Sequence, residues 1–133
     1  MLQKLNKTRG GFTLVEIMIV VAIIAMLAAI AVPNFLRARK RSQATRVLED
    51  LRMIDAAIDQ YAIETNKVSG DTVAWADVKA YLKTGSTLYT SSGKDMLGHN
   101  FLIPKVDTIP TVPALTFTAL SDVAPQEFWS PYY

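Results

Sequence analysis

The carboxylate of Glu16 is the side chain whose position most needs a chemical explanation. It lies in a segment that is apolar from Phe12 to Val32 apart from Thr13 and Glu16 itself. A carboxylate in such a segment is costly unless it meets a cation or stays near a polar surface. The pattern therefore predicts that Glu16 has a charged partner or a functional role.

Other side chains suited to chemistry are few. The chain has no cysteine, so thiol nucleophiles, disulfides and cysteine-ligated metals are excluded. His99 is the one histidine, which excludes a histidine pair for a metal and leaves a histidine-based triad unsupported. The acids near the C-terminus, Asp107, Asp122 and Glu127, do not form a recognisable calcium loop. We expect no enzyme, no cofactor and no metal site.

The element that must position Glu16 is a long apolar helix. Twenty-one residues from Phe12 to Val32 would extend roughly 31 Å, which matches the hydrocarbon core of a bilayer. Residues 1–11 are short, basic and polar, and they end in Gly10 and Gly11. Basic residues also follow the apolar run, so the flanking charges alone do not decide the orientation. A targeting leader followed by a single membrane span is expected.

A second helical segment follows Pro33, where we expect a kink and not a stop. Residues 34–66 form an amphipathic helix with one apolar stripe at spacings of four and three. The stripe consists of Val47, Leu51, Ile54, Ile58 and Tyr61. It requires a partner surface, which residues 67–133 should supply.

Residues 67–133 are predicted to form a small head with a short helix and antiparallel strands. Asp71 can cap the helix, and Gly85 lies just past its end. Strands are expected at 87–90, 101–106 and 115–120. In the last of these segments, polar and apolar residues alternate. The fold class is therefore α+β, with a long N-terminal helix packed against a small sheet.

Two readings of the N-terminal region come from general membrane rules. One is a secretory signal cut after Ala31, which would leave a soluble chain starting at Val32. The other is a single-pass anchor carrying a binding module that never polymerises. Neither explains the paired glycines, and the anchor leaves Glu16 without a purpose.

The order Gly11, Phe12, Thr13, Leu14, Val15, Glu16, followed by IMIVVAIIAMLAAIAVP, closely resembles the leader and N-terminal helix of type IV pilins and type II secretion pseudopilins. The resemblance implies that a prepilin peptidase cuts after Gly11 and methylates the new amine of Phe12. It also implies one inner-membrane pass, with the N-terminus inside and the head in the periplasm, before assembly into a periplasmic or extracellular filament. Many family members carry glycine at the position of Ala25, and alanine disfavours local melting of the helix there.

Assembly residues follow from the same resemblance. The family's proposed partner for Glu16 is the Phe12 ammonium of a neighbouring subunit, so the chain is expected to polymerise with itself and with other pilins or pseudopilins. An assembly platform and its ATPase in the inner membrane are implied partners. A pseudopilin that drives protein export is the leading interpretation, and a type IVa pilin for adhesion, twitching or DNA uptake is the alternative.

Two further segments, a basic cluster after the apolar run and a glycine-containing segment near residue 98, are interpreted without a catalytic role. The basic residues Arg37, Arg39, Lys40 and Arg41 lie just beyond the apolar run, where lipid phosphates are the nearest anions, so no nucleic acid is expected. The segment from Asp95 to Phe101 resembles a degenerate form of the Asp-Pro-Trp-Gly-Asn-Pro-Tyr segment of major pseudopilins. Its simpler interpretation is a turn in which Gly98 takes a positive φ.

Overall fold

The computed structural model describes residues 10–133. They belong to two compact units, one ending at Leu36 and one running from Arg37 to Tyr133. Helix α1 (Leu14–Thr65) contributes to both units. The leader predicted at 1–11 lies outside the described residues except for Gly10 and Gly11.

The described part of the first unit, residues 10–36, is mainly the apolar part of α1. Its most apolar 18 residues have a mean hydropathy of 2.9, and none of that stretch is buried. By length and composition α1 can therefore cross a membrane. The helix continues through Pro33 without interruption, although proline removes one backbone donor there.

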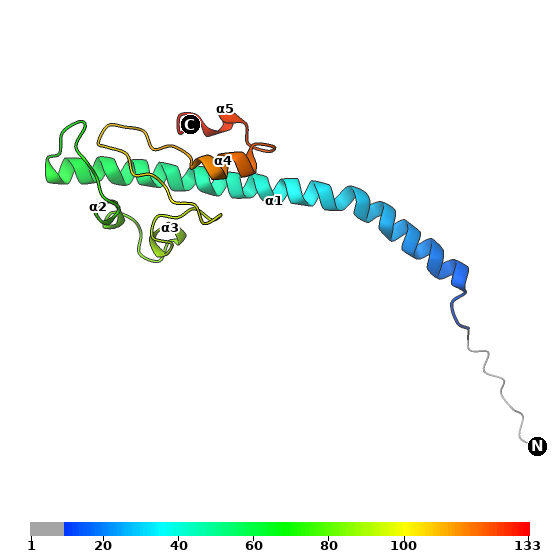
Figure 1. Ribbon diagram of the computed structural model, residues 1–133. Helices are drawn as coiled ribbons and strands as arrows, with labels where there is room; N and C mark the ends of the chain where they lie inside the picture. Colours follow the sequence, from blue (N-terminus) through cyan, green and yellow to red (C-terminus); the bar gives the residue numbers. More distant parts are fainter. Residues whose placement is uncertain (1–9) are drawn as a thin grey trace, which may run out of the picture. The chain divides into compact units, whose positions relative to one another are not determined.

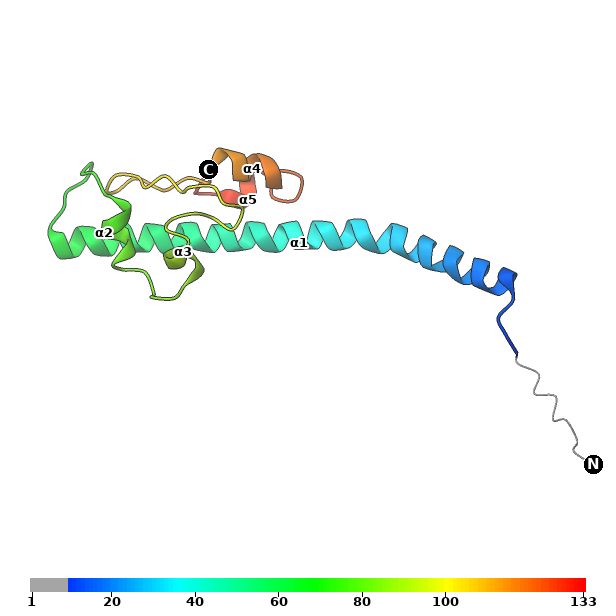
Figure 2. The same cartoon turned by 60° about the horizontal axis from the view of Figure 1, so that its bottom comes forward.

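The second unit is built on the remainder of α1. The chain after Thr65 runs along this part of the helix, with α2 (Trp75–Lys79) and α3 (Thr87–Thr90) on one side and α4 (Ala114–Leu120) and α5 (Gln126–Trp129) on another (Figures 1 and 2). Four members of the predicted stripe are confirmed on the inner face of α1, since Val47, Leu51, Ile54 and Ile58 are buried. The fifth, Tyr61, is only half-buried. Each such side chain contributes about 1.5–3 kcal/mol when fully buried.

The other side of the core comes from the segments after α1. Its largest member is Trp129, which is fully buried and whose Nε1 donates to the Ala124 carbonyl at 3.0 Å. Three residues later in the chain, the Tyr132 carbonyl accepts the Val112 N–H at 2.8 Å. The C-terminal segment is therefore fixed by both packing and backbone hydrogen bonds. The remaining core residues after α1 are Val78, Leu82, Leu88, Phe101, Leu120 and Ala124.

The predicted antiparallel sheet is not confirmed, because no strand forms within residues 10–133. Residues 87–90 form α3 instead, since the Ser86 side chain accepts the Tyr89 N–H at 3.2 Å and caps a helical turn. Residues 101–106 are irregular, and the nearest pairing is an isolated antiparallel bridge between Lys94 and Asn100. The described part of the head is thus helical and irregular.

Residues 115–120, expected as a strand, belong to α4. Thr116 and Leu120 are almost completely buried, whereas Leu115 is 67% exposed. Buried positions four residues apart fit a helix, whereas a strand would bury every second residue. The alternation in the sequence did not reflect burial.

The short helix expected near Trp75 is present as α2, but Asp71, the residue predicted to cap it, does not do so. Asp71 accepts the Val68 N–H at 3.0 Å and closes a preceding turn. At the start of α2, the Asp77 carboxylate accepts the Ala74 N–H at 3.0 Å. Gly85 follows the helix with φ of 87°, as a turn residue.

Candidate functional site

The first turn of α1 brings Thr13 and Glu16 together. The Thr13 N–H donates to Glu16 Oε2 at 2.9 Å, and the Glu16 N–H donates to Thr13 Oγ1 at 3.2 Å. This reciprocal pair is a capping box, in which two backbone donors that lack helical partners are satisfied by side chains. Glu16 therefore has a partner within its own chain.

Electrostatics favour the same arrangement. Backbone dipoles leave the N-terminal end of a helix partly positive, and Glu16 is the acidic residue of the first turn of α1. The sequence reasoning missed this role of Thr13, although Thr-x-x-Glu before an apolar run is the known signal for a capping box. The carboxylate has two oxygens, and this hydrogen bond occupies Oε2.

The predicted cleavage point lies before this turn. Gly10, Gly11 and Phe12 are exposed and outside the helix, and the Phe12 side chain is 87% exposed. A β-carbon added at Gly11 would meet no atom within 4 Å. The described fold does not itself require glycine at this position, so a requirement for it would come from a molecule that binds the segment.

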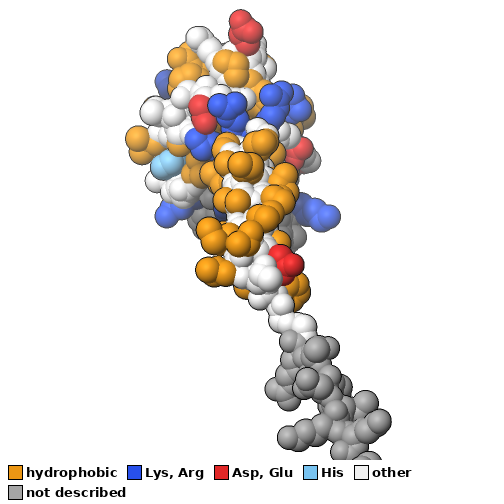
Figure 3. All heavy atoms as spheres, turned by 90° about the vertical axis from the view of Figure 1, so that its right-hand side faces the viewer, with side chains coloured by type: hydrophobic (Ala, Val, Ile, Leu, Met, Phe, Trp, Pro, Cys, Tyr) orange, Lys and Arg blue, Asp and Glu red, His pale blue; other side chains and the backbone are white. Residues whose placement is uncertain are grey.

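Side chains from Phe12 to Leu36 present an uncovered apolar surface. Figure 3 shows hydrophobic side chains covering this segment on the face drawn. Even the least exposed large side chains here, such as Leu36 at 50% and Ile17 at 51%, are half exposed to solvent. Lipid or neighbouring apolar helices would satisfy such a surface, whereas water would not.

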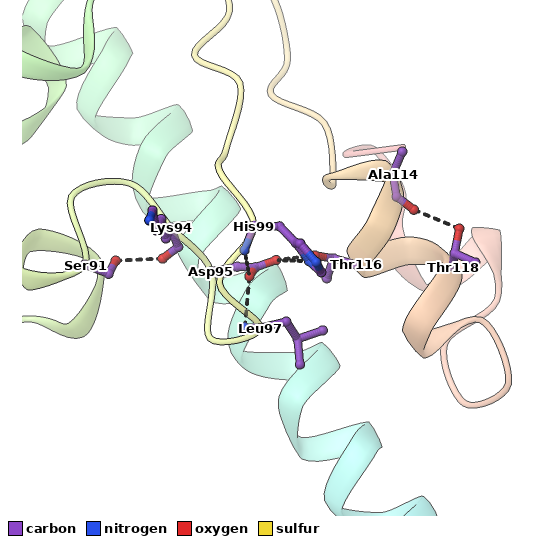
Figure 4. Close-up of polar contacts among 8 residues, drawn as sticks. All are labelled: Ser91, Lys94, Asp95, Leu97, His99, Ala114, Thr116 and Thr118. Atoms are coloured by element: carbon purple, nitrogen blue, oxygen red, sulfur yellow. Dashed lines mark hydrogen bonds and ion pairs between the residues drawn. The ribbon is translucent and has the colours of Figure 1, made fainter.

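A polar cluster joins the predicted turn at 95–101 to α4 (Figure 4). Asp95 is buried, and its Oδ1 accepts the N–H groups of Leu97 and His99 at 2.9 Å each. Its Oδ2 accepts the hydroxyl of Thr116, which also lies 2.7 Å from His99 Nδ1. Gly98 has φ of 89°, so the interpretation of this segment as a turn is confirmed.

The same three side chains, Asp95, His99 and Thr116, do not have the geometry of a catalytic triad. In a triad the histidine takes the hydroxyl proton, and the acid orients the other ring nitrogen. Here the Thr116 hydroxyl donates its hydrogen bond to Asp95, and both groups face the same His99 nitrogen, Nδ1. Thr116 is fully buried, so no substrate reaches it. The cluster holds the turn on α4.

A second buried carboxylate lies nearby on α1. Asp50 is 9% exposed and lines a cavity of about 240 Å³ with Arg46, Glu49 and Lys94 among its neighbours. Burial raises the pKa of Asp50 to about 6, with a further rise from Glu49 and a reduction from Arg46. Among residues 10–133, no three histidine or acidic side chains converge to hold a metal. Because its pKa is raised in the folded chain, Asp50 should make the stability of this unit depend on pH.

Comparison with known proteins finds a family match in the N-terminal segment. The prokaryotic N-terminal methylation motif matches residues 6–32. A fimbrial protein of Pseudomonas aeruginosa is 35% identical over 91 residues, which are 68% of this chain and 59% of that protein. No solved structure matches the chain.

Two shorter matches are to proteins of two different systems. The type IV wide pilus major component PilA4 of Thermus thermophilus is 44% identical over 64 residues, 48% of this chain and 49% of that protein. The type II secretion system core protein G of Klebsiella pneumoniae is 35% identical over 57 residues, 43% of this chain and 41% of that protein. The chain therefore spans 41% to 59% of the lengths of these three relatives.

Proposed function

Since the chain belongs to the family of type IV pilins and type II secretion pseudopilins, we propose that it is a structural subunit of a type IV-like filament and not an enzyme. The observation that carries this proposal is the exposed apolar surface from Phe12 to Leu36, with Glu16 in the first turn of α1. Such a surface can exchange lipid for neighbouring helices without refolding.

Processing is the first step of the proposed function. A prepilin peptidase in the membrane would cut the exposed bond between Gly11 and Phe12 and methylate the new amine. Because Gly11 precedes the helix, the peptidase would find an extended backbone without a side chain. Thr13 would become the second residue, and the capping box would survive because it uses the Thr13 N–H and hydroxyl.

Assembly would use the free side of the Glu16 carboxylate. Oε2 is engaged by Thr13, and Oε1 remains able to accept the Phe12 ammonium of a neighbouring subunit. At 4 Å and an effective dielectric near 20 that attraction is about 4 kcal/mol before desolvation, which cancels much of it. The main gain is register, because a subunit displaced along its neighbour would leave both charges buried and unpaired.

Location follows from processing and assembly. The chain would cross the inner membrane once, with its N-terminus in the cytoplasm and residues 37–133 in the periplasm. An assembly platform and its ATPase would then lift subunits into the filament. In this account the polymer contains further copies of the chain and related pilins or pseudopilins.

We assign the filament to a type II secretion pseudopilus as the leading proposal. It is supported by the resemblance of the 95–101 turn to a pseudopilin segment and by the match to core protein G. A type IV pilus is the second candidate, and it is supported by the longer match to the Pseudomonas fimbrial protein. The two differ in what the filament does.

Deleting the gene in the native bacterium separates the two candidates. A secretion pseudopilin predicts that exported proteins remain in the periplasm while surface pili and twitching are unchanged. A pilus subunit predicts the loss of sheared surface fibres with normal export. Normal fibres together with normal export would contradict the filament proposal, provided that immunoblotting confirms expression in the parent strain.

A further inference from the structure

Three arginines just beyond the apolar segment, Arg37, Arg39 and Arg41, are exposed and form no ion pair within residues 10–133. Lys40, between them, is different, since its Nζ lies 2.9 Å from Asp122 Oδ2. The hydrogen bond from Lys40 lowers the pKa of Asp122, and Arg37 is near enough to lower it further. Helix α1 carries no acidic residue between Glu16 and Glu49, so the arginines have no acidic neighbour along the helix.

These three residues, called here the basic collar, surround the helix instead of lining one side. Successive helical residues turn by about 100°, so Arg37 and Arg41 lie about 40° apart and Arg39 about 160° from each. A nucleic acid or a protein partner would approach one side of the helix. A planar layer of anions around a spanning helix would meet all three arginines.

The position of the collar along the helix fits such a layer. Arg37 directly follows Leu36, the end of the exposed apolar side chains of the segment. From Arg37 to Arg41 the helix rises about 6 Å, and a headgroup layer is roughly 5–7 Å thick on each side of a bilayer. All three guanidinium groups therefore reach one layer of lipid phosphates.

We propose that the basic collar binds the headgroups of anionic phospholipids. The side of the membrane rests on the proposed function, in which residues 37–133 are periplasmic. On that side the usual bias places few basic residues, so three unpaired arginines there call for a ligand. Each contributes an attraction to an anionic surface that salt screens within about a Debye length.

The test uses the full chain reconstituted in phosphatidylcholine bilayers with trace spin-labelled phosphatidylglycerol or phosphatidylcholine. Electron spin resonance gives the association of each lipid with the protein. The wild type should prefer phosphatidylglycerol several-fold, and high salt should weaken the preference. The triple variant Arg37→Gln, Arg39→Gln, Arg41→Gln should bind the two lipids equally. Replacing the same three arginines by lysine should keep the preference, because the charges remain.

A matched control removes three exposed charges elsewhere in the second unit, with Arg46→Gln, Arg52→Gln and Lys67→Gln. This variant should keep the wild-type preference. Equal loss in both variants would mean that net charge alone acts, and it would overturn the proposal. So would a collar variant that still prefers phosphatidylglycerol, or collar-dependent binding of a DNA duplex without lipid preference. No filament is needed in this assay, so its failure is distinct from failure of the proposed function.

Discussion

Thr13 and Glu16 satisfy each other's backbone at the start of α1, through hydrogen bonds of 2.9 and 3.2 Å. This relationship gives Glu16 two separable tasks. Within one subunit, its carboxyl oxygen caps the N-terminal end of the helix. Its negative charge is available to a neighbouring subunit. Variants that keep one task and remove the other therefore test the assembly account.

Glu16→Gln should leave the start of the helix intact and impair assembly. The glutamine side-chain oxygen can still accept the Thr13 N–H, but it carries no charge for the Phe12 ammonium. We expect filament yield in sheared fractions to fall at least about tenfold, equivalent to about 1.4 kcal/mol. Thr13→Ala is the reciprocal control, since it keeps the charge and costs the helix start only about 1 kcal/mol. A normal yield from Glu16→Gln would contradict the pairing.

Thr116→Val should destabilise the second unit. Valine fills the same space but leaves Asp95 Oδ2 and His99 Nδ1 without their hydroxyl partner. A buried group left unpaired costs about 1–3 kcal/mol. Urea unfolding of the full chain in detergent measures the change, with Thr116→Ser as the control that keeps the hydroxyl. If valine proved as stable as serine, the polar cluster would not hold α4.

Asp50→Asn should change how stability depends on pH. Burial raises the folded-state pKa of Asp50 to about 6, above the ordinary value of 3.8. The folded state therefore binds the proton more tightly. The resulting stabilisation is fully present below about pH 3.8 and is lost as pH rises through about 6.

The asparagine variant should be more stable than the wild type at pH 7.5, by about 1 kcal/mol after allowance for solvent screening. The difference should largely vanish at about pH 3, where Asp50 is mostly protonated in both folded and unfolded chains. Urea unfolding at the two pH values measures it. Asp107→Asn is the control, because Asp107 is exposed and asparagine tolerates its φ of 61°. This variant should show no such pH-dependent difference in stability. An equal response of both variants would remove Asp50 as the cause.

Gly93→Ala should destabilise the head more than Gly70→Ala does. Both glycines have positive φ, 81° and 87°, so both variants carry a similar backbone cost. Only at Gly93 would the new methyl group lie 3.0 Å from the Trp75 ring. We expect an additional loss of about 1–3 kcal/mol and a change in tryptophan fluorescence. Equal losses would mean that Trp75 moves aside freely.

The sequence was most informative where one physical requirement dominated. The stripe that contains Val47, Leu51 and Ile54 follows the helical period because it must face a single core, and the structure buries all three. The extended apolar surface around Phe12 was likewise readable from composition. In both cases many consecutive residues indicate the same structure, so one misleading residue does not change the prediction.

The head was harder to predict because its elements are short. In residues 115–120 the polar Thr116 is buried and the apolar Leu115 is exposed, so polarity gave the wrong periodicity. Thr116 can be buried because Asp95, 21 residues earlier in the chain, accepts a hydrogen bond from its hydroxyl. A contact between distant residues of this kind leaves no periodic trace in the sequence.

The intact mass and N-terminal sequence of the protein from native membranes or sheared fibres would show whether a prepilin peptidase processes it. Processing should give a chain that begins at Phe12 with a methylated amine, while a Gly11→Val variant keeps its leader. A chain that begins at Met1 or Val32 would rule out the pairing of Phe12 with Glu16, because no Phe12 ammonium would then exist.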